Sequence, residues 1–269
     1  MMDEYRTSNR NMWDELAEIN SRSHFYNLDG FKAGQNILHP LELTELGPDV
    51  PGKRLLHLQC HFGMDTLAWA RLGAEVTGVD FSPRAVELAR GIAAELNIPA
   101  RFLCTDLYDL PQHLDETFDI VFTSYGVLTW LSDLKGWAEL ISRYLRPGGI
   151  FYIAEFHPFA MMLDDESDAP RLRYDYFDPN VITFPTQGSY ADREAEIKTQ
   201  VSYEWQHTLG EIITALCAAG LRIEYLHEHE SMCYQMAPYM PETSPGEFRL
   251  PPDHPRLPLA FSLRATKPA

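Results

Sequence analysis

Hydrophobic positions follow two alternating spacings from Lys53 to Phe156. Short apolar runs predict buried strands, and apolar residues three or four positions apart predict helices between them. The runs LLHLQC, AEVTGVD, ARFLCTD, FDIVFTS and IFYIAEF predict strands over residues 55–60, 74–80, 100–106, 118–124 and 150–156. Helices are predicted over 65–72, 83–96 and 133–145, with Ser82 and Ser132 capping the last two. This alternation is typical of a parallel sheet with helices on both faces.

The end of the chain departs from this alternation. Thr208 and Glu211 have the spacing of a capping box, which predicts a helix that ends at Gly220. Two further apolar runs predict strands over 221–229 and 258–267, with no helix between them and an ordered Pro-rich loop over 238–258. We therefore predict an α/β fold, a Rossmann-like doubly wound sheet of seven strands that ends with an antiparallel strand.

Length and composition favour one domain. A chain of 269 residues with 45% apolar content can bury a large core, so we expect a single domain over 1–269. The acidic and aromatic segment 157–206 interrupts the alternation, and we interpret it as an insertion near the active site.

The net charge narrows the possible partners. A formal charge of −17 makes nucleic acid and anionic membranes poor partners, because their binding depends on Lys and Arg. No apolar run is long enough to span a bilayer, and the first residues, MMDEYRTSNR, lack the apolar core of a signal peptide. The four cysteines show no Cys-x-x-Cys pair and are expected to be reduced thiols. These features predict a cytoplasmic protein.

In a doubly wound sheet the ligand lies beyond the carboxyl ends of the strands, so the loops there carry the candidate chemistry. The loop that ends at Gly63 leads into a helix whose amino-terminal amides can accept a carboxylate. Asp80 ends the second strand, where a carboxylate can bind both hydroxyls of a ribose; the alternative is a helix cap, for which Ser82 is better placed. Asp106 ends the third strand and can accept from an adenine amino group, with Leu107 packed on the ring, or it is simply a turn aspartate.

Three stretches of sequence carry a family resemblance. LLHLQCHFGMDTLAWARLGAEVTGVDFS, FDIVFTSYGVLTWL and LRPGGIFYIAEFHP resemble bacterial class I S-adenosylmethionine (SAM) dependent methyltransferases. The chain is similar to one branch in particular, in which LQCHFG stands where DxGCGTG is common. This similarity extends from about Asn9 to Lys267. The resemblance implies SAM as cofactor and transfer of its methyl group to a small-molecule acceptor by in-line displacement.

The resemblance also implies roles for individual residues. Those expected around the methionine part of SAM are Gln59, Cys60, His61 and Gly63. The ribose and adenine parts are assigned to Asp80, Phe81, Asp106 and Leu107. Ser124 and Tyr125 are expected to face the sulfonium and the substrate. The chain departs from the family pattern because His57 replaces an acidic residue and Gln59 and His61 replace glycines, so the loop is bulkier than usual.

Three residues are candidates for contact with the methyl acceptor. His157 is placed to act as a general base, and Tyr125 and Trp130 to line the acceptor site. The alternatives are a turn histidine before Pro158 and aromatic rings that only pack in the core; His207 is the next candidate base. Related enzymes also imply that segment 1–50, with Trp13, folds over the cofactor as a lid, although a helix docked for stability alone would have the same pattern. We expect no metal site.

Two other functions remain as alternatives. A NAD-dependent oxidoreductase would also use an acidic residue after the second strand, but Gly-x-Gly-x-x-Gly is missing after the first. A SAM-binding module without transferase activity is compatible with the same motifs. The sequence predicts neither the acceptor nor the oligomeric state.

Overall fold

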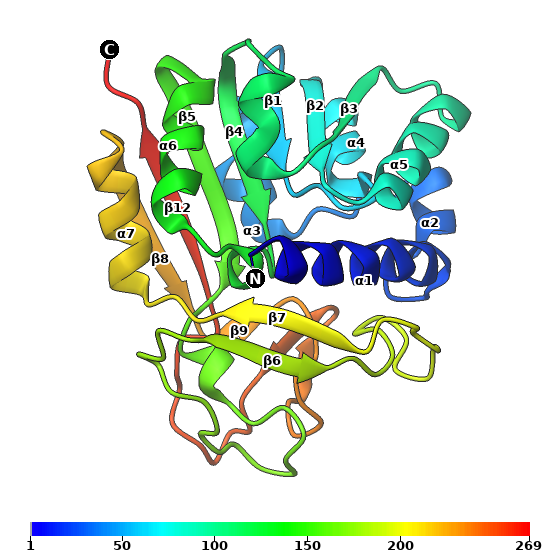
Figure 1. Ribbon diagram of the computed structural model, residues 1–269, viewed down its shortest axis with the longest axis vertical. Coiled ribbons are helices and arrows are strands. Elements are labelled where there is room, and N and C mark those ends of the chain that lie inside the picture. The colour runs from blue at the N-terminus through cyan, green and yellow to red at the C-terminus, as the bar shows by residue number, and fades with distance from the viewer. Residues whose placement is uncertain (1) are drawn as a thin grey trace.

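A seven-stranded sheet forms the centre of the protein, in the order β3-β2-β1-β4-β5-β12-β8. The computed structural model describes residues 2–269 (Figure 1). The sheet strands are β1 (Arg54–Leu58), β2 (Glu75–Asp80), β3 (Ala100–Cys104), β4 (Phe118–Ser124), β5 (Leu145–Phe156), β8 (Arg222–His229) and β12 (Ala260–Thr266). The first five pair in parallel, and β12 is antiparallel to both β5 and β8. The predicted fold class and its terminal antiparallel strand are confirmed.

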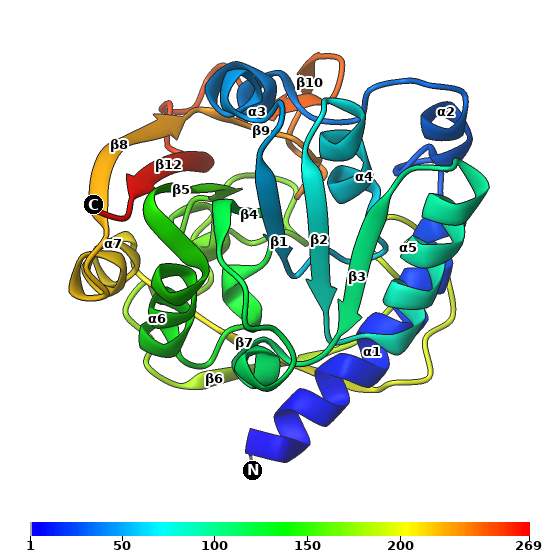
Figure 2. The ribbon, with the colours of Figure 1, turned by 90° about the horizontal axis from the view of Figure 1, so that it is seen from above.

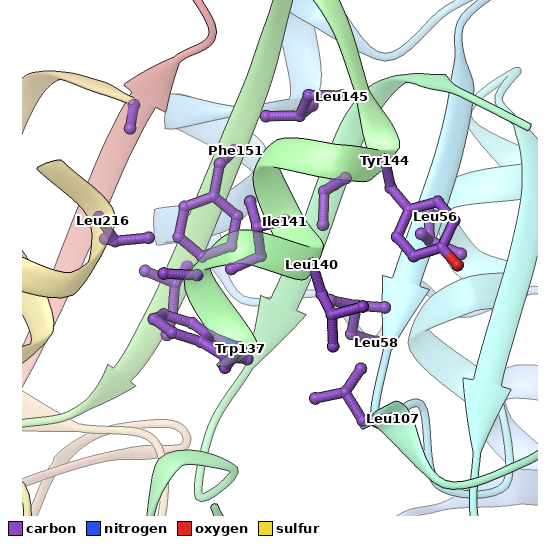
Figure 3. Packing of buried hydrophobic residues seen from close by; sticks show 14 of the residues in the cluster. Leu56, Leu58, Leu107, Trp137, Leu140, Ile141, Tyr144, Leu145, Phe151 and Leu216 are labelled. Atoms are coloured by element: carbon purple, nitrogen blue, oxygen red, sulfur yellow. The ribbon is translucent and has the colours of Figure 1, made fainter. Parts of the chain in front are cut away.

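Helices cover both faces of the sheet, as Figure 2 shows from above. They are α3 (Pro40–Glu45), α4 (Met64–Arg71), α5 (Pro83–Glu95), α6 (Leu134–Tyr144) and α7 (Leu209–Ala218). On β1, Leu56 faces α6 and α7, whereas Leu55 faces the layer of α3, α4 and α5, because successive side chains of a strand point to opposite faces. Trp137 and Ile141 of α6 meet Phe151 of β5 at the centre of the first layer (Figure 3).

The helix starts test the sequence signals for caps. Ser82 accepts from the Ala85 amide at the start of α5, and Thr208 and Glu211 form the predicted capping box of α7. The prediction for Ser132 is wrong by one residue, since Asp133 accepts from the Gly136 amide at 2.9 Å. An Asp side chain can fill the same cap, which explains the error.

The remaining elements lie mostly at the carboxyl edge of the sheet (Figure 1). They are α1 (Met2–Arg22), α2 (Leu28–Lys32), β6 (Val181–Pro185), β7 (Val201–Trp205), β9 (Ser231–Met232), β10 (Glu242–Ser244), β11 (Glu247–Arg249), and the 3-10 helices η1 (Gly47–Asp49), η2 (Leu107–Gln112), η3 (Leu128–Trp130) and η4 (Ala160–Met162). Of these, α2 instead packs on Arg71 at the end of α4, and η1 comes just before the start of β1. The prediction of a loop over 238–258 is wrong, because this stretch contains β10 and β11, which form a three-stranded sheet with β9. Their exposed, charged residues gave no strand signal.

Helix α1 joins the insertion to the rest of the protein. The Asn9 amide donates to the Tyr203 carbonyl on β7 at 2.7 Å and accepts from its amide at 2.9 Å. Glu15 accepts from the amides of Lys198 and Thr199 just before β7. Asp14 accepts from the Ser82 hydroxyl at 2.5 Å, which fixes the helix to the start of α5. We call α1 together with the β6-β7 pair the cover. No helix among residues 2–269 is both long and apolar enough to cross a membrane.

Candidate active site at the carboxyl edge of the sheet

The loop after β1 has an unusual backbone. Gln59 has φ 56° and His61 has φ 49°, both in the left-handed region, and Gly63 follows with φ 80°. This conformation costs a non-glycine residue roughly 1–2 kcal/mol, and it persists only where neighbours hold it. Here the side chains do so: Gln59 Nε2 donates to the Val127 carbonyl at 3.1 Å, and His61 Nε2 lies 3.1 Å from Asn20 Nδ2 of α1. The residues that replace glycines therefore tie this loop to two other segments.

Close packing explains the glycine and the cysteine of the same loop. A Cβ atom at Gly63 would lie 2.8 Å from the Ala89 Cβ, so α4 can start here only with glycine. Cys60 is 4% exposed, and its sulfur would lie 2.8 Å from a Cβ atom at Gly78. Burial raises the pKa of the Cys60 thiol. Cys60 thus packs beneath the loop, and a contact with a ligand there falls to the backbone.

Asp80 connects the ends of β1 and β2. Its Oδ2 accepts from the His61 amide at 2.8 Å, and its Oδ1 accepts from the Ser82 amide at 2.9 Å. The side chain is buried, and burial raises its pKa to about 6 against these hydrogen bonds. A carboxylate has about four acceptor positions, so two remain for a ligand.

The residues after β3 are engaged in the protein itself. Asp106 caps η2 by accepting from the Tyr108 amide at 2.9 Å, and Arg6 of α1 lies 3.9 Å from its other oxygen. Leu107 is buried in the core with Val79, whereas Phe81 is partly exposed. The turn role foreseen as the alternative for Asp106 is present, and its neighbour Arg6 is one that no sequence signal predicts.

The loop after β4 is held by an acid that sequence reasoning missed. Glu155, at the end of β5, accepts from the amides of Gly126, Val127 and Leu128, and from that of Phe156 at 2.7 Å. It is 2% exposed; burial raises its pKa, while the four amides oppose the rise. The signal was an acid inside the apolar run IFYIAEF. This carboxylate fixes the backbone that presents Ser124 and Tyr125.

Two further acids, Asp65 and Glu42, lie near the end of β4. Asp65 Oδ2 is 3.3 Å from the Ser124 hydroxyl, and burial raises the pKa of Asp65 to about 6. Burial, and then the charge of Asp65, raises the pKa of Glu42 in α3. Glu42 is 1% exposed; its Oε2 accepts from the His39 amide at 2.9 Å, and its Oε1 has no hydrogen-bond partner among the described residues.

Aromatic rings from separate segments form a continuous group beside these acids, which we call the aromatic recess. Its members are Phe25, Tyr26, Tyr125, Phe156, Tyr190 and Tyr234. Tyr190 is 39% and Phe25 48% exposed, so these rings reach solvent. Next to the recess, Trp13 of α1 packs edge-on against His61 at 5.2 Å and Trp130 at 5.3 Å. The structure thus brings Tyr125, Trp130 and His61 to one edge of the sheet.

His157 lies apart from this group. Its Nδ1 accepts from the Phe159 amide at 3.0 Å, and its Nε2 lies 3.1 Å from Glu228. Burial lowers the pKa of His157, and the carboxylate of Glu228 opposes this. Both nitrogens therefore face protein groups, which favours the turn role over the role of a base.

His207 lines a small, open pocket of about 30 Å³, which is room for about one or two water molecules. The pocket is lined by Gly126, Leu128, Thr129, Glu155, Phe156, Pro158, Met161, Trp205, Gln206, His207 and Ile212. His207 Nε2 lies 2.7 Å from the Leu131 carbonyl, so this nitrogen is engaged within the protein. Burial lowers the pKa of His207. No group of three metal-ligating side chains occurs among residues 2–269.

Known proteins match the segment that carries these loops. Residues 56–153 match a family model described as a methyltransferase domain. The sequence is 29% identical over 143 residues to the ubiquinone biosynthesis O-methyltransferase of Xanthomonas campestris pv. campestris. The matched region is 52% of this chain and 59% of that relative. The chain thus spans less than two thirds of the length of that relative.

Solved structures establish the fold. A SAM-dependent methyltransferase from Clostridium acetobutylicum aligns with a TM-score of 0.60 over 96% of this chain and 100% of its own, at 15% identity. The [4+2]-cyclase SpnF aligns with a TM-score of 0.52 over 85% and 80%, at 19% identity. The chain has the class I SAM-dependent methyltransferase fold.

Proposed function

We propose that this protein is a SAM-dependent methyltransferase that moves a methyl group to a small-molecule acceptor by in-line displacement. The position of Asp80 carries the proposal. Its carboxylate lies at the carboxyl end of β2, bonded to the backbone of the loop after β1, inside the stretch 56–153 that matches the methyltransferase domain. That is where a doubly wound sheet binds its nucleotide.

The chemistry of the loop fits this cofactor. Gln59 Oε1 is buried without a hydrogen-bond partner among the described residues, so it can accept from the ammonium of the methionine part. The amino-terminal amides of α4, after Gly63, favour its carboxylate. Asp80 has acceptor positions left for the ribose hydroxyls, and Phe81 and Asp106 lie at the adenine side. When bound, SAM would supply a methyl group whose carbon the lone pair of an acceptor can attack, with the sulfur as the leaving group.

The protein itself orients the reacting groups and excludes water from them. Glu155 holds the loop after β4 so that Ser124 and Tyr125 stay at the carboxyl edge of β4. Orientation of this kind can lower the barrier by several kcal/mol. Segment 1–50 acts as a lid through α1, and 157–206 as an insertion near the active site through β7; the hydrogen bonds between them support this assignment. Together the two segments exclude water from the reaction.

The roles on the acceptor side follow from exposure and contacts. Tyr125 and Trp130 contact the acceptor. Of the two histidines considered as a base, His207 has better support than His157, because it lines a pocket, whereas both ring nitrogens of His157 face protein groups. The acceptor is a metabolite and not a nucleic acid, in keeping with the charge of −17. The four cysteines are free thiols, which supports a cytoplasmic protein.

One alternative function remains a candidate. The [4+2]-cyclase among the structural neighbours indicates that this fold is not restricted to methyl transfer, so a SAM-binding module without transferase activity is the second candidate. The experiment that separates the two is turnover of SAM to S-adenosylhomocysteine (SAH) with a panel of amines, phenols, thiols and carboxylates. A transferase produces SAH with at least one class and a methylated product of matching mass. Tight SAM binding with no product from any class would favour the rival.

A further inference from the structure

We propose that the methyl acceptor is an amine, which binds in the aromatic recess as a cation beside the carboxyl groups of Glu42 and Asp65. This inference rests on the proposed function, and it adds the substrate class. It is carried by the ring network, by the two carboxyl groups beside it, and by an oxygen atom of Glu42 that has no hydrogen-bond partner among the described residues.

The ring network runs without a break from the surface to the end of β4. Phe25 and Tyr190 lie 5.8 Å apart at the exposed end, and Tyr190 and Tyr234 lie 6.4 Å apart. Phe156 continues the line, 5.5 Å from Tyr234 and 5.8 Å from Tyr125. Aromatic faces attract cations within about 6 Å of the ring centroid, and more strongly where water is excluded. The recess therefore suits a positively charged group.

The ionisable groups beside the rings are mainly acids. Asp65 Oδ2 lies 3.3 Å from the hydroxyl of Ser124, the neighbour of Tyr125. The backbone amide of His39 donates to Glu42, and the His39 ring lies 5.4 Å from the Tyr125 ring. Burial raises the pKa of Glu42 and of Asp65, and an ammonium group beside them would favour their ionised forms. Burial raises the pKa of Tyr234, and the positive charge of Arg193 opposes this rise. A carboxylate or phosphate acceptor would be repelled here, whereas an ammonium group would be attracted.

The third observation is the orphaned oxygen of Glu42. The capping box of α3 uses Oε2, but Oε1 has no hydrogen-bond partner among the described residues, although the residue is 1% exposed. A buried acceptor without a donor costs about 1–3 kcal/mol. An ammonium group supplies several N–H donors and would remove that cost.

A hydroxyl acceptor, for which phenol and benzyl alcohol are simple probes, is the strongest rival, because the Xanthomonas relative is named an O-methyltransferase. The family match covers residues 56–153, however, and leaves out Glu42, Tyr190 and Tyr234. The recess is thus built largely from segments outside that match, so the acceptor class of the relative does not follow for this chain.

The transfer balances for an amine. The ammonium first loses one proton to a carboxylate of the Glu42 and Asp65 pair. The nitrogen lone pair then forms the bond to the methyl carbon, while the sulfur–methyl bond breaks and its electron pair stays on sulfur. The products are SAH and a protonated N-methylamine, and no oxidant or other reactant is needed.

The test uses four small probes on the full-length protein with SAH present: benzylamine, benzyl alcohol, benzoate and phenol. Tryptophan fluorescence or ligand-observed NMR measures each dissociation constant. We expect benzylamine to bind at least tenfold more tightly than benzyl alcohol, and benzoate to bind most weakly. Equal or tighter binding of phenol or benzoate overturns the proposal.

Glu42→Gln tests the role of the charge, because glutamine can still accept from the His39 amide and preserve the cap. We expect benzylamine affinity to fall about tenfold while SAH affinity stays within threefold. Glu45→Gln is the matched control on the same helix: its carboxylate bonds to Tyr152 and His227 and lies outside the recess, so both affinities should be unchanged.

The two proposals fail in different ways. If Glu42→Gln weakens SAH and leaves benzylamine unchanged, the carboxylate serves the cofactor, and the amine proposal is wrong. If the unchanged protein does not bind SAH at all, the proposed function is contradicted, and the four probes are then compared without SAH. Selective benzylamine binding that depends on Glu42 would still support the recess as an amine site.

Discussion

The sheet and the cover are held together by different forces. In the sheet, Trp137, Ile141 and Phe151 are fully buried apolar side chains that interlock between layers (Figure 3). The cover depends more on side-chain hydrogen bonds to backbone, such as those of Asn9 to Tyr203, because β6 and β7 are mostly only partly buried, although α1 also buries Leu16 and Ala17. Burial of apolar area contributes more per residue than a net hydrogen bond, which is worth about 0.5–1.5 kcal/mol. We therefore expect the β6-β7 part of the cover to open more readily than the sheet.

The largest effect should come from the sheet. Trp137→Ala removes the fully buried side chain at the centre of α6. We expect the free energy of unfolding to fall by about 3–5 kcal/mol, because the cavity left behind collapses only in part. Urea denaturation measures the change. A loss below about 1 kcal/mol would contradict the packed layer as the main source of stability.

Much of the sheet could be predicted from the sequence, but the cover could not. Apolar periodicity locates β1 to β5 because burial imposes it on the residues themselves. Three of the four backbone amides that donate to Glu155 lie 27 to 29 residues earlier in the chain, and no residue pattern encodes them. The positive φ angles of Gln59 and His61 are equally hidden, since the sequence shows only that glycines are missing. The contact of Asn9 with β7 joins residues 194 positions apart.

Asn9→Ala should produce a smaller and more local effect. It removes both hydrogen bonds to Tyr203, so we expect a loss of about 1–2 kcal/mol in the free energy of local opening. Hydrogen exchange of the β7 amides should accelerate by about tenfold, while that of β4 stays unchanged. Asn11→Ala, at an exposed position of α1, is the matched control. Equal acceleration in both strands would mean that cover and sheet open as one unit.

His61→Gly should have the smallest effect on stability. Glycine relieves the strain of φ 49°, worth about 1 kcal/mol, but loses the contact with Asn20. We therefore expect the free energy of unfolding to change by less than about 1 kcal/mol. SAH should nevertheless dissociate several-fold faster in stopped-flow experiments, because the cover loses its tie to the cofactor loop. An unchanged dissociation rate would remove His61 from the control of the lid.

The most direct test of the central claim is a calorimetric titration with SAH, comparing the unchanged protein with Asp80→Ala. We predict micromolar binding that weakens at least tenfold in the variant, since a carboxylate bonded to two hydroxyls contributes about 1.5–3 kcal/mol. The pKa of Asp80 is raised to about 6, so its carboxyl is mostly protonated at pH 5 and ionised at pH 7. SAH should therefore bind the unchanged protein about tenfold more weakly at pH 5 than at pH 7, and the variant should lose this dependence. Unchanged affinity in a folded Asp80→Ala protein, or tight binding of NAD in place of SAH, would contradict the account.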